Sequence, residues 1–166
     1  MEQDSLKALF LAAFDEYSDA IFRFCVVKTG NRELAEDLTQ DTFMRFWQAL
    51  RGGATMTNTR SYLYTIANNA VIDWYRKKKS DSLDQKAEGG FQVADERALS
   101  PDANAAYAEI LRNMQKLAAG DAEVLVMRYV DGLEPRDIAE ILGESANTVS
   151  VRINRATNRL KEQLGV

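Results

Sequence analysis

The sequence between Glu134 and Ala156 has the pattern of two short helices joined by a tight turn. Ala139 is small enough for a second helix to cross close to the first. Gly143 follows four residues later and can take the left-handed conformation that ends a helix. Val149 lies six residues beyond Gly143 and would fill the angle between the helices. This spacing predicts a helix-turn-helix over the last quarter of the chain.

The second helix of this unit is capped and basic. Ser145 can cap it, with Thr148 at the third helical position. Its positive side chains are Arg152, Arg155, Arg159 and Lys161. A short helix, a turn and a basic second helix fit the major groove of duplex DNA. The alternative is an ordinary helical hairpin inside a core, in which the spacing and the one-sided arginines would coincide by accident.

The charge of the whole chain argues against indiscriminate nucleic-acid binding. There are 21 basic and 25 acidic side chains, a net charge of −4, so basic surfaces must be segregated if DNA is the target. The absence of histidine removes the usual partner of zinc sites and of Ser-His and Cys-His catalysis, and we expect no cofactor and no metal. Cys25 has no second cysteine to pair with and is expected in the core. With no signal peptide and no long apolar run, we expect no membrane segment and a cytoplasmic location.

Apolar residues recur at helical spacing along the chain and, with only 9 glycines and 2 prolines, favour an all-α fold. The pattern predicts helices over 4–28, 32–50 and 60–79, broken by glycine-containing turns. Further helices are expected over 101–118 and from the capping residue Asp121 to about Tyr129, before the helix-turn-helix.

Between these two sets of helices the composition becomes acidic. From Asp81 to Glu109 seven acids outweigh two bases, which is typical of a solvated linker. We therefore predict two small helical domains, 1–80 and 101–166, joined by an acidic linker over 81–100. The second would be a four-helix domain that contains the helix-turn-helix.

The expected third helix combines aromatic side chains with a basic end. Its aromatic and amide residues are Tyr62, Tyr64, Asn68, Asn69, Trp74 and Tyr75, and its basic end runs from Arg76 to Lys79. Aromatic rings beside positive charge suit unstacked bases, and asparagine amides can pair with a base edge. The alternatives are that the aromatic residues form core and that the basic run is a solvated helix end, where cations complement the helix dipole.

Four segments together resemble the extracytoplasmic-function group of bacterial sigma factors, in the sigma-70 family. They are Ala35–Trp47, Ser61–Asp73, Val126–Leu133 and Ile138–Lys161. The first and last are quite specific, and the resemblance covers nearly the whole chain outside the linker. It implies a promoter-specificity subunit of RNA polymerase: 1–80 would dock on the core enzyme and melt the minus-ten element, and 101–166 would bind the minus-thirty-five element.

The resemblance also implies the residues of each surface. The core-polymerase contacts would be Asp37, Gln40, Asp41, Met44 and Trp47, with burial in the core as the alternative for Met44 and Trp47. The minus-ten contacts would be Tyr64, Asn68, Asn69, Arg76, Lys77 and Lys78. The minus-thirty-five contacts would be Ala146, Asn147, Thr148, Ser150, Arg152 and Arg155. Two positions depart from the group, since Ser150 stands where lysine is frequent and Thr65 where a basic residue is common.

The implied partners are core RNA polymerase, through its β′ and β subunits, promoter DNA and an anti-sigma factor, and no catalysis is expected. Two other functions compete with this interpretation. A stand-alone helix-turn-helix regulator would bind a palindrome as a dimer, and it would leave the second and third helices unexplained. A helical enzyme would need a site, and the sequence has neither histidine nor a glycine-rich phosphate loop.

Overall fold

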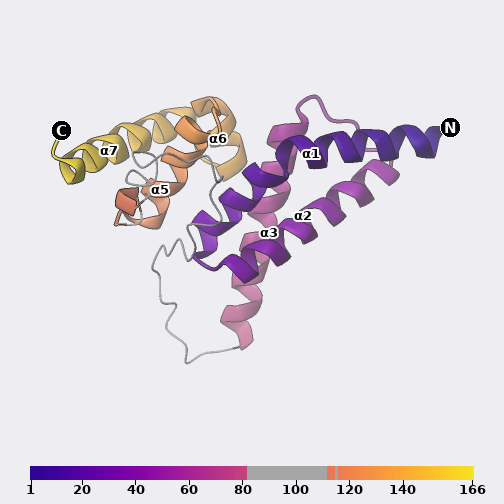
Figure 1. Cartoon of the computed structure of the whole chain (residues 1–166), viewed down its shortest axis with the longest axis horizontal. Coiled ribbons are helices and arrows are strands. Elements are labelled where there is room, and N and C mark those ends of the chain that lie inside the picture. Colours follow the sequence, from indigo (N-terminus) through magenta and orange to yellow (C-terminus); the bar gives the residue numbers. More distant parts are fainter. Residues whose placement is uncertain (82–111, 115) are drawn as a thin grey trace.

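The computed structural model describes residues 1–81, 112–114 and 116–166, and within these ranges all regular secondary structure is helical. The N-terminal group consists of α1 (Glu2–Thr29), α2 (Arg32–Arg51) and α3 (Thr59–Asp81). The C-terminal group contains α5 (Ala119–Leu125), the π-helical turn η2 (Val126–Val130), α6 (Pro135–Leu142) and α7 (Ala146–Leu164). Figure 1 shows the two groups side by side, with the chain termini at opposite ends. The predicted all-α fold is confirmed.

The three N-terminal helices pack around an aromatic core. The rings of Phe10 and Phe46 are 6.0 Å apart, and Phe24 meets Tyr64 edge-on at 5.4 Å. Cys25 is fully buried, and burial raises the pKa of its thiol to about 12. A thiol with so high a pKa is not a nucleophile near neutral pH, which agrees with the predicted core role.

The long helices begin and end close to the predicted positions because local residues cap them. Helix α1 ends at Gly30, whose N–H donates to Val26 O. The side chain of Asn31 then accepts from Leu34 N at 3.1 Å and caps α2. The side chain of Asn58 accepts from Ser61 N at 3.1 Å at the start of α3. Each cap satisfies backbone groups that a helix end leaves unpaired.

The helix-turn-helix has the predicted geometry. Gly143 ends α6 with φ at +69°, a conformation that favours glycine. Thr148 N donates to the Ser145 hydroxyl at 3.1 Å, so Ser145 caps α7 as expected. Val149 is fully buried and Ala139 is 5% exposed where the two helices cross. Local residue choice therefore dictates this unit.

One capping prediction is wrong. Helix α5 begins at Ala119, so Asp121 lies inside its first turn instead of preceding it. The Asp121 carboxylate forms an ion pair with Arg159 of α7, and this tertiary contact replaces the cap. The helix predicted to end near Tyr129 ends at Val130, with its last turn in the π conformation.

The predicted linker lies outside the described residues except for Asp81, as does most of the helix predicted over 101–118. Across the described ranges, no helix combines the length and the apolar character that crossing a membrane requires. The two helix groups are in contact, with α3 against α6 and α1 against α5. This contact determines which of the predicted surface residues are accessible.

Candidate nucleic-acid and protein interfaces

The five residues predicted to contact a large protein partner fall along one side of α2. Asp37, Gln40 and Met44 are exposed, Met44 to 61%. Asp41 is half-buried and pairs with Arg45 at 3.1 Å. Trp47 is half-buried, with its ring 5.4 Å from that of Phe10. The structure therefore brings these side chains together as an acidic and amide stripe beside an apolar anchor, and Met44 does not belong to the core.

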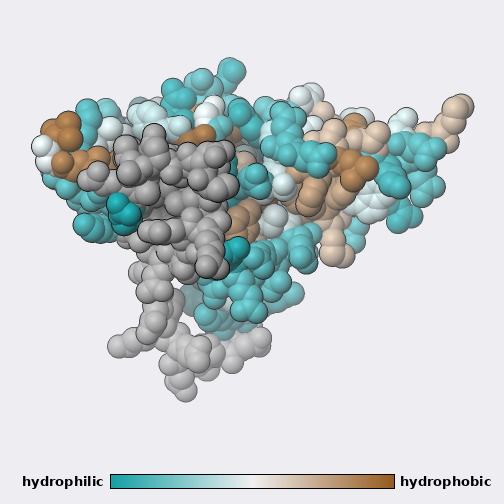
Figure 2. Space-filling view, viewed as in Figure 1, coloured by the Kyte–Doolittle hydropathy of each residue, from teal (hydrophilic) through white to brown (hydrophobic). Residues whose placement is uncertain are grey.

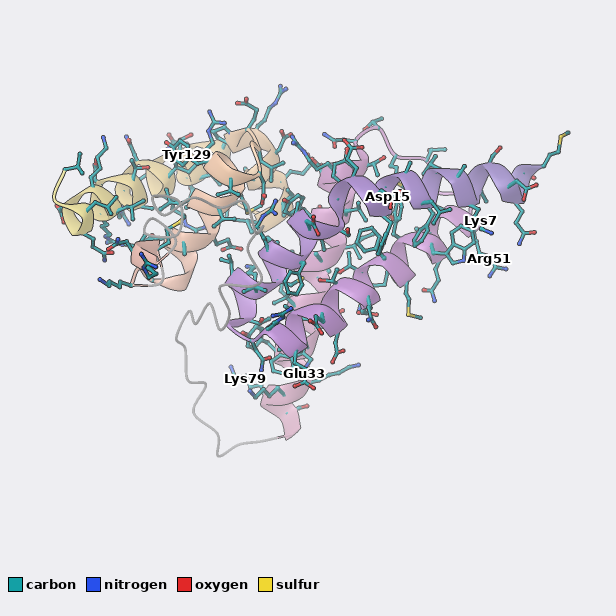
Figure 3. The ribbon with its side chains drawn as sticks, viewed as in Figure 1. Lys7, Asp15, Glu33, Arg51, Lys79 and Tyr129 are labelled. Carbon is teal, nitrogen blue, oxygen red and sulfur yellow. The ribbon has the colours of Figure 1, made fainter. Side chains whose placement is uncertain are left out.

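On α3 the outer half is accessible. Asn69 is exposed, and so are Arg76, Lys77 and Lys78 at the end of the helix. The ammonium group of Lys78 lies 4.9 Å from the centre of the Trp74 ring, a cation–π contact. Lys79 marks this outer end in Figure 3, on the side of the molecule away from the C-terminal group. The basic end is thus exposed on the surface of the molecule.

The inner half of α3, which holds the predicted minus-ten contacts Tyr64 and Asn68, is buried in this arrangement. Tyr64 is fully buried beside Phe24, which agrees with the core alternative for the aromatic residues. Burial, together with the nearby Asp131 carboxylate, raises the pKa of the Tyr64 hydroxyl. Asn68 is 6% exposed, and its amide donates to Ile141 O of α6 at 3.2 Å. Tyr64 faces α1 and Asn68 faces α6, so neither side chain can stack on or pair with a base in this arrangement.

The predicted DNA-facing residues of α7 lie at its exposed N-terminal half. Ala146, Asn147, Thr148, Ser150 and Arg155 are all exposed. The hydroxyl groups of Ser145 and Thr148 lie 2.7 Å apart, so Thr148 also supports the cap. The first turn of α7 therefore presents short polar side chains, with the Arg155 cation about two turns further on, a surface suited to base edges and phosphates.

Arg152 differs from the other predicted DNA contacts on α7, because its guanidinium is engaged within the chain. Its guanidinium pairs with Glu144 at 2.7 Å, lies 3.9 Å from Glu123 and donates to Gly120 O at 3.0 Å. A side chain at Gly120 would place Cβ 2.9 Å from this guanidinium, so glycine permits the approach. In this arrangement Arg152 joins α5 and the turn to α7.

We expect Arg152→Ala to destabilise the C-terminal helix group by about 1–2 kcal/mol, because it removes charge-assisted hydrogen bonds that are partly shielded from water. Thermal unfolding followed by circular dichroism measures this effect. Arg155→Ala is the matched control, since Arg155 is an exposed arginine on the same helix. Equal melting temperatures for the two variants would contradict this role of Arg152.

The contact between the helix groups is polar and was not foreseen in the sequence. Arg23 of α1 pairs with Asp131 at 2.9 Å, and the Asp131 side chain is 1% exposed. Arg60 of α3 donates to the backbone oxygen of the same residue at 3.3 Å. Lys28 pairs with Glu123 of α5 at 2.5 Å. The residues Asp131 and Gly132 are typical of a turn. No local sequence pattern, however, identifies their contact partners, which lie more than 70 residues away in the chain.

In the ranges that the structure covers, no group of three or more side chains of the kinds that bind metal ions comes together. The exposed functional groups are instead amides, carboxylates, cations and apolar side chains. These groups bind macromolecules.

Comparison with known proteins agrees with this arrangement. The family model described as Sigma-70 region 2 matches residues 13–80, and that described as Sigma-70, region 4 matches residues 107–160. RNA polymerase sigma factor YlaC of Bacillus subtilis (strain 168) is 31% identical over 165 residues, which cover 98% of this chain and 93% of YlaC. The ECF RNA polymerase sigma factor SigW of the same strain is 32% identical over 165 residues, covering 93% and 88%. Among solved structures, the sigma factor RpoE in complex with the anti-sigma factor NepR from Bartonella quintana is similar, with a TM-score of 0.76 and 26% identity over 95% of this chain and 97% of that one.

Proposed function

This chain belongs to the extracytoplasmic-function group of the sigma-70 family of RNA polymerase sigma factors, and we propose that three of its surfaces divide the work of promoter recognition between them. One side of α2 docks on the core enzyme, the outer half of α3 engages the opened minus-ten element, and the start of α7 reads the minus-thirty-five element. Residues 1–80 and 101–166 would be the two functional domains, with 81–100 as the linker.

The α2 stripe suits a helical partner surface. Asp37 and Gln40 offer exposed acceptors, and Met44 and Trp47 offer apolar contact area beside them. Interfaces of this kind draw most of their affinity from a few large apolar and charged side chains. The proposed partner is a helical region of the β′ subunit, with the β subunit as a second contact of the core enzyme.

On α3, the proposal for the minus-ten element rests on Asn69 and on the basic end of the helix. The Asn69 amide is exposed and can hydrogen-bond an unpaired base edge, and Arg76, Lys77 and Lys78 can neutralise phosphates beside it. Asn68 would join this surface only after α6 has moved away, and Tyr64 would support it from the core.

The observation that carries the proposal is that α3 and α7 expose two separate groups of polar and basic side chains of different character. The end of α3 joins cations to the aromatic pair Trp74 and Tyr75, whose rings are 5.1 Å apart. The start of α7 presents short polar groups on a helix-turn-helix. A stand-alone duplex-binding regulator needs only the second surface.

Runoff transcription with purified core RNA polymerase on a randomised promoter library tests the function. Addition of the protein should produce defined start sites whose upstream sequences share two motifs. Transcripts without a shared minus-ten motif would contradict the role of α3, and tight duplex binding without polymerase would favour the stand-alone regulator.

Asn69→Ala should impair strand opening about tenfold, because loss of one good base contact costs about 1–3 kcal/mol. Permanganate footprinting of the minus-ten region at saturating polymerase measures the opening. Asn147→Ala is the matched control, since it removes an exposed amide from α7 and should weaken upstream binding, with a pre-melted template partly restoring transcription. Equal opening by wild type and Asn69→Ala on several promoters would mean that α3 is not the melting surface.

The packed arrangement of the two helix groups is incompatible with simultaneous binding of both elements. The elements lie about 25 base pairs apart, which is about 85 Å along B-form DNA. In the structure α6 lies against α3 and covers Asn68. We infer that the groups separate when the chain binds polymerase and promoter.

The remaining parts of the proposal concern partners and location. RpoE is similar over nearly its whole length and was solved with an anti-sigma factor, so we propose that an anti-sigma factor also restrains this chain. As a transcription initiation factor it would act in the cytoplasm, and it would perform no chemical step itself.

A further inference from the structure

An ion-pair bridge joins α2 to the middle of α3. Arg45 of α2 lies between two carboxylates: its Nε is 3.1 Å from Asp41 Oδ2 on the same helix, and its Nη1 is 3.1 Å from Asp73 Oδ2 on α3. The contact with Asp73 is also a hydrogen bond that the guanidinium donates. Neither Arg45 nor Asp73 belongs to a predicted contact surface, so the function of this bridge is open.

Asp73 lies on the side of α3 that is proposed to meet the opened strand. Residues three or four apart are neighbours on a helix surface, and Asp73 comes four residues after Asn69 and three before Arg76. Both neighbours are exposed, and the Asp73 side chain is itself 46% exposed. Figure 2 shows hydrophilic residues gathered over this end of α3. An acid thus stands between the amide and the cations of the proposed minus-ten surface.

An uncompensated carboxylate at this position would oppose the binding of a DNA strand. Every nucleotide brings a negatively charged phosphate, which repels a nearby carboxylate. The guanidinium of Arg45 is always charged, so its contact compensates the charge of Asp73. The Arg45 side chain is 38% exposed, and the positive charge therefore stays near the surface. In this way α2 supplies the charge that makes the middle of α3 compatible with a phosphate backbone.

We propose that Arg45 is a positioning residue for promoter opening: it neutralises Asp73 and holds that carboxylate toward α2, away from the phosphates of the opened strand. The inference rests on the proposed function of α3 at the minus-ten element. Arg45 acts through Asp73 and needs no contact with a base. The second carboxylate, that of Asp41, holds the guanidinium from the other side and so limits its freedom to leave Asp73.

The alternative is that the bridge only fastens α2 to α3. Ion pairs with this much exposure contribute little to stability, because water screens them. For a fastening role, loss of Asp73 would be as harmful as loss of Arg45, and loss of both would be no better than loss of one. The two partners have opposite effects in the proposal, since removal of Arg45 leaves an uncompensated anion and removal of the Asp73 charge abolishes it.

Permanganate footprinting of the minus-ten region tests the proposal with full-length variants at saturating core RNA polymerase. Arg45→Ala should reduce opening about fivefold, whereas Arg45→Lys should retain most of it because lysine keeps the positive charge. Adding Asp73→Asn to Arg45→Ala should restore opening to within about twofold of wild type, because the amide carries no charge. Arg51→Ala is the matched control and should open normally, since it removes an exposed arginine of α2 that Figure 3 places far from Lys79.

The single variant Asp73→Asn gives a test that does not depend on the folding of Arg45→Ala. It should open the promoter at least as well as wild type, and a loss of opening would show that the bridge only fastens the helices. A double variant that opens no better than Arg45→Ala, or an equal loss in Arg51→Ala, would also overturn the proposal.

Asn69→Ala in the same footprinting separates this inference from the assignment of α3. If Asn69→Ala impairs opening while Arg45→Ala opens the promoter as wild type does, the bridge has no role in opening and the assignment of α3 stands. If neither variant impairs opening, the assignment of α3 fails together with the inference.

Discussion

The double variant Asp37→Arg, Gln40→Ala should bind core RNA polymerase at least about 30-fold more weakly than the wild-type chain, a loss of about 2 kcal/mol or more. Asp37 and Gln40 are exposed, so the substitutions leave the aromatic core of the N-terminal group intact. The expected loss arises because arginine reverses the charge of the stripe at the position where the partner is proposed to bind. The dissociation constant at several salt concentrations measures it.

Asp19→Arg provides the control for this variant. Asp19 is an exposed acid on α1 that does not line the apolar groove between α1 and α2. Its replacement by arginine changes the net charge by the same amount as Asp37→Arg. Core binding should be unchanged in this control. A similar loss in both variants would show that total charge, and not the α2 stripe, determines the affinity.

The second large effect is expected at the contact between the two helix groups. Asp131→Ala removes a buried carboxylate that pairs with Arg23 at 2.9 Å. Removing Asp131 should cost about 1–3 kcal/mol, because a charge-assisted hydrogen bond is lost while the Arg23 side chain, 32% exposed, keeps contact with water. We expect this variant to favour a separated arrangement, and an increased radius of gyration in small-angle X-ray scattering measures that change.

A charge exchange tests the specificity of this pair. Arg23→Asp combined with Asp131→Arg restores opposite charges and should recover part of the compact population, whereas each single substitution should not. Helix content should remain that of the wild type, because the pair lies between the groups and not within one of them. A compact Asp131→Ala variant with wild-type scattering would contradict the role of this ion pair.

The elements that were predictable are those whose causes lie within a few residues. Asn31 and Ser145 each cap the helix that follows by accepting from the backbone N–H three residues ahead. Gly143 ends α6 because glycine readily takes the left-handed conformation. Cys25 was expected in the core from its residue type and Val149 from the spacing of the helix-turn-helix, and both are fully buried. The resemblance supplied the docking stripe, and a period of three to four residues keeps Asp37, Gln40 and Met44 on one side of α2.

The sequence by itself therefore determined the three N-terminal helices, the Ser145 cap, the helix-turn-helix and the family. Only the tertiary structure decided that Tyr64 is core, that Asn68 lies under α6 and that Arg152 joins α5 to α7. These outcomes depend on contacts between residues far apart in the chain, such as Asn68 with Ile141 and Arg152 with Gly120. Between Tyr62 and Ala67 of α3, five of six positions are apolar or aromatic, so the helical period alone could not say which side faces α1. Packing against α1 and α6 breaks that ambiguity, because an apolar side is buried only where another helix covers it.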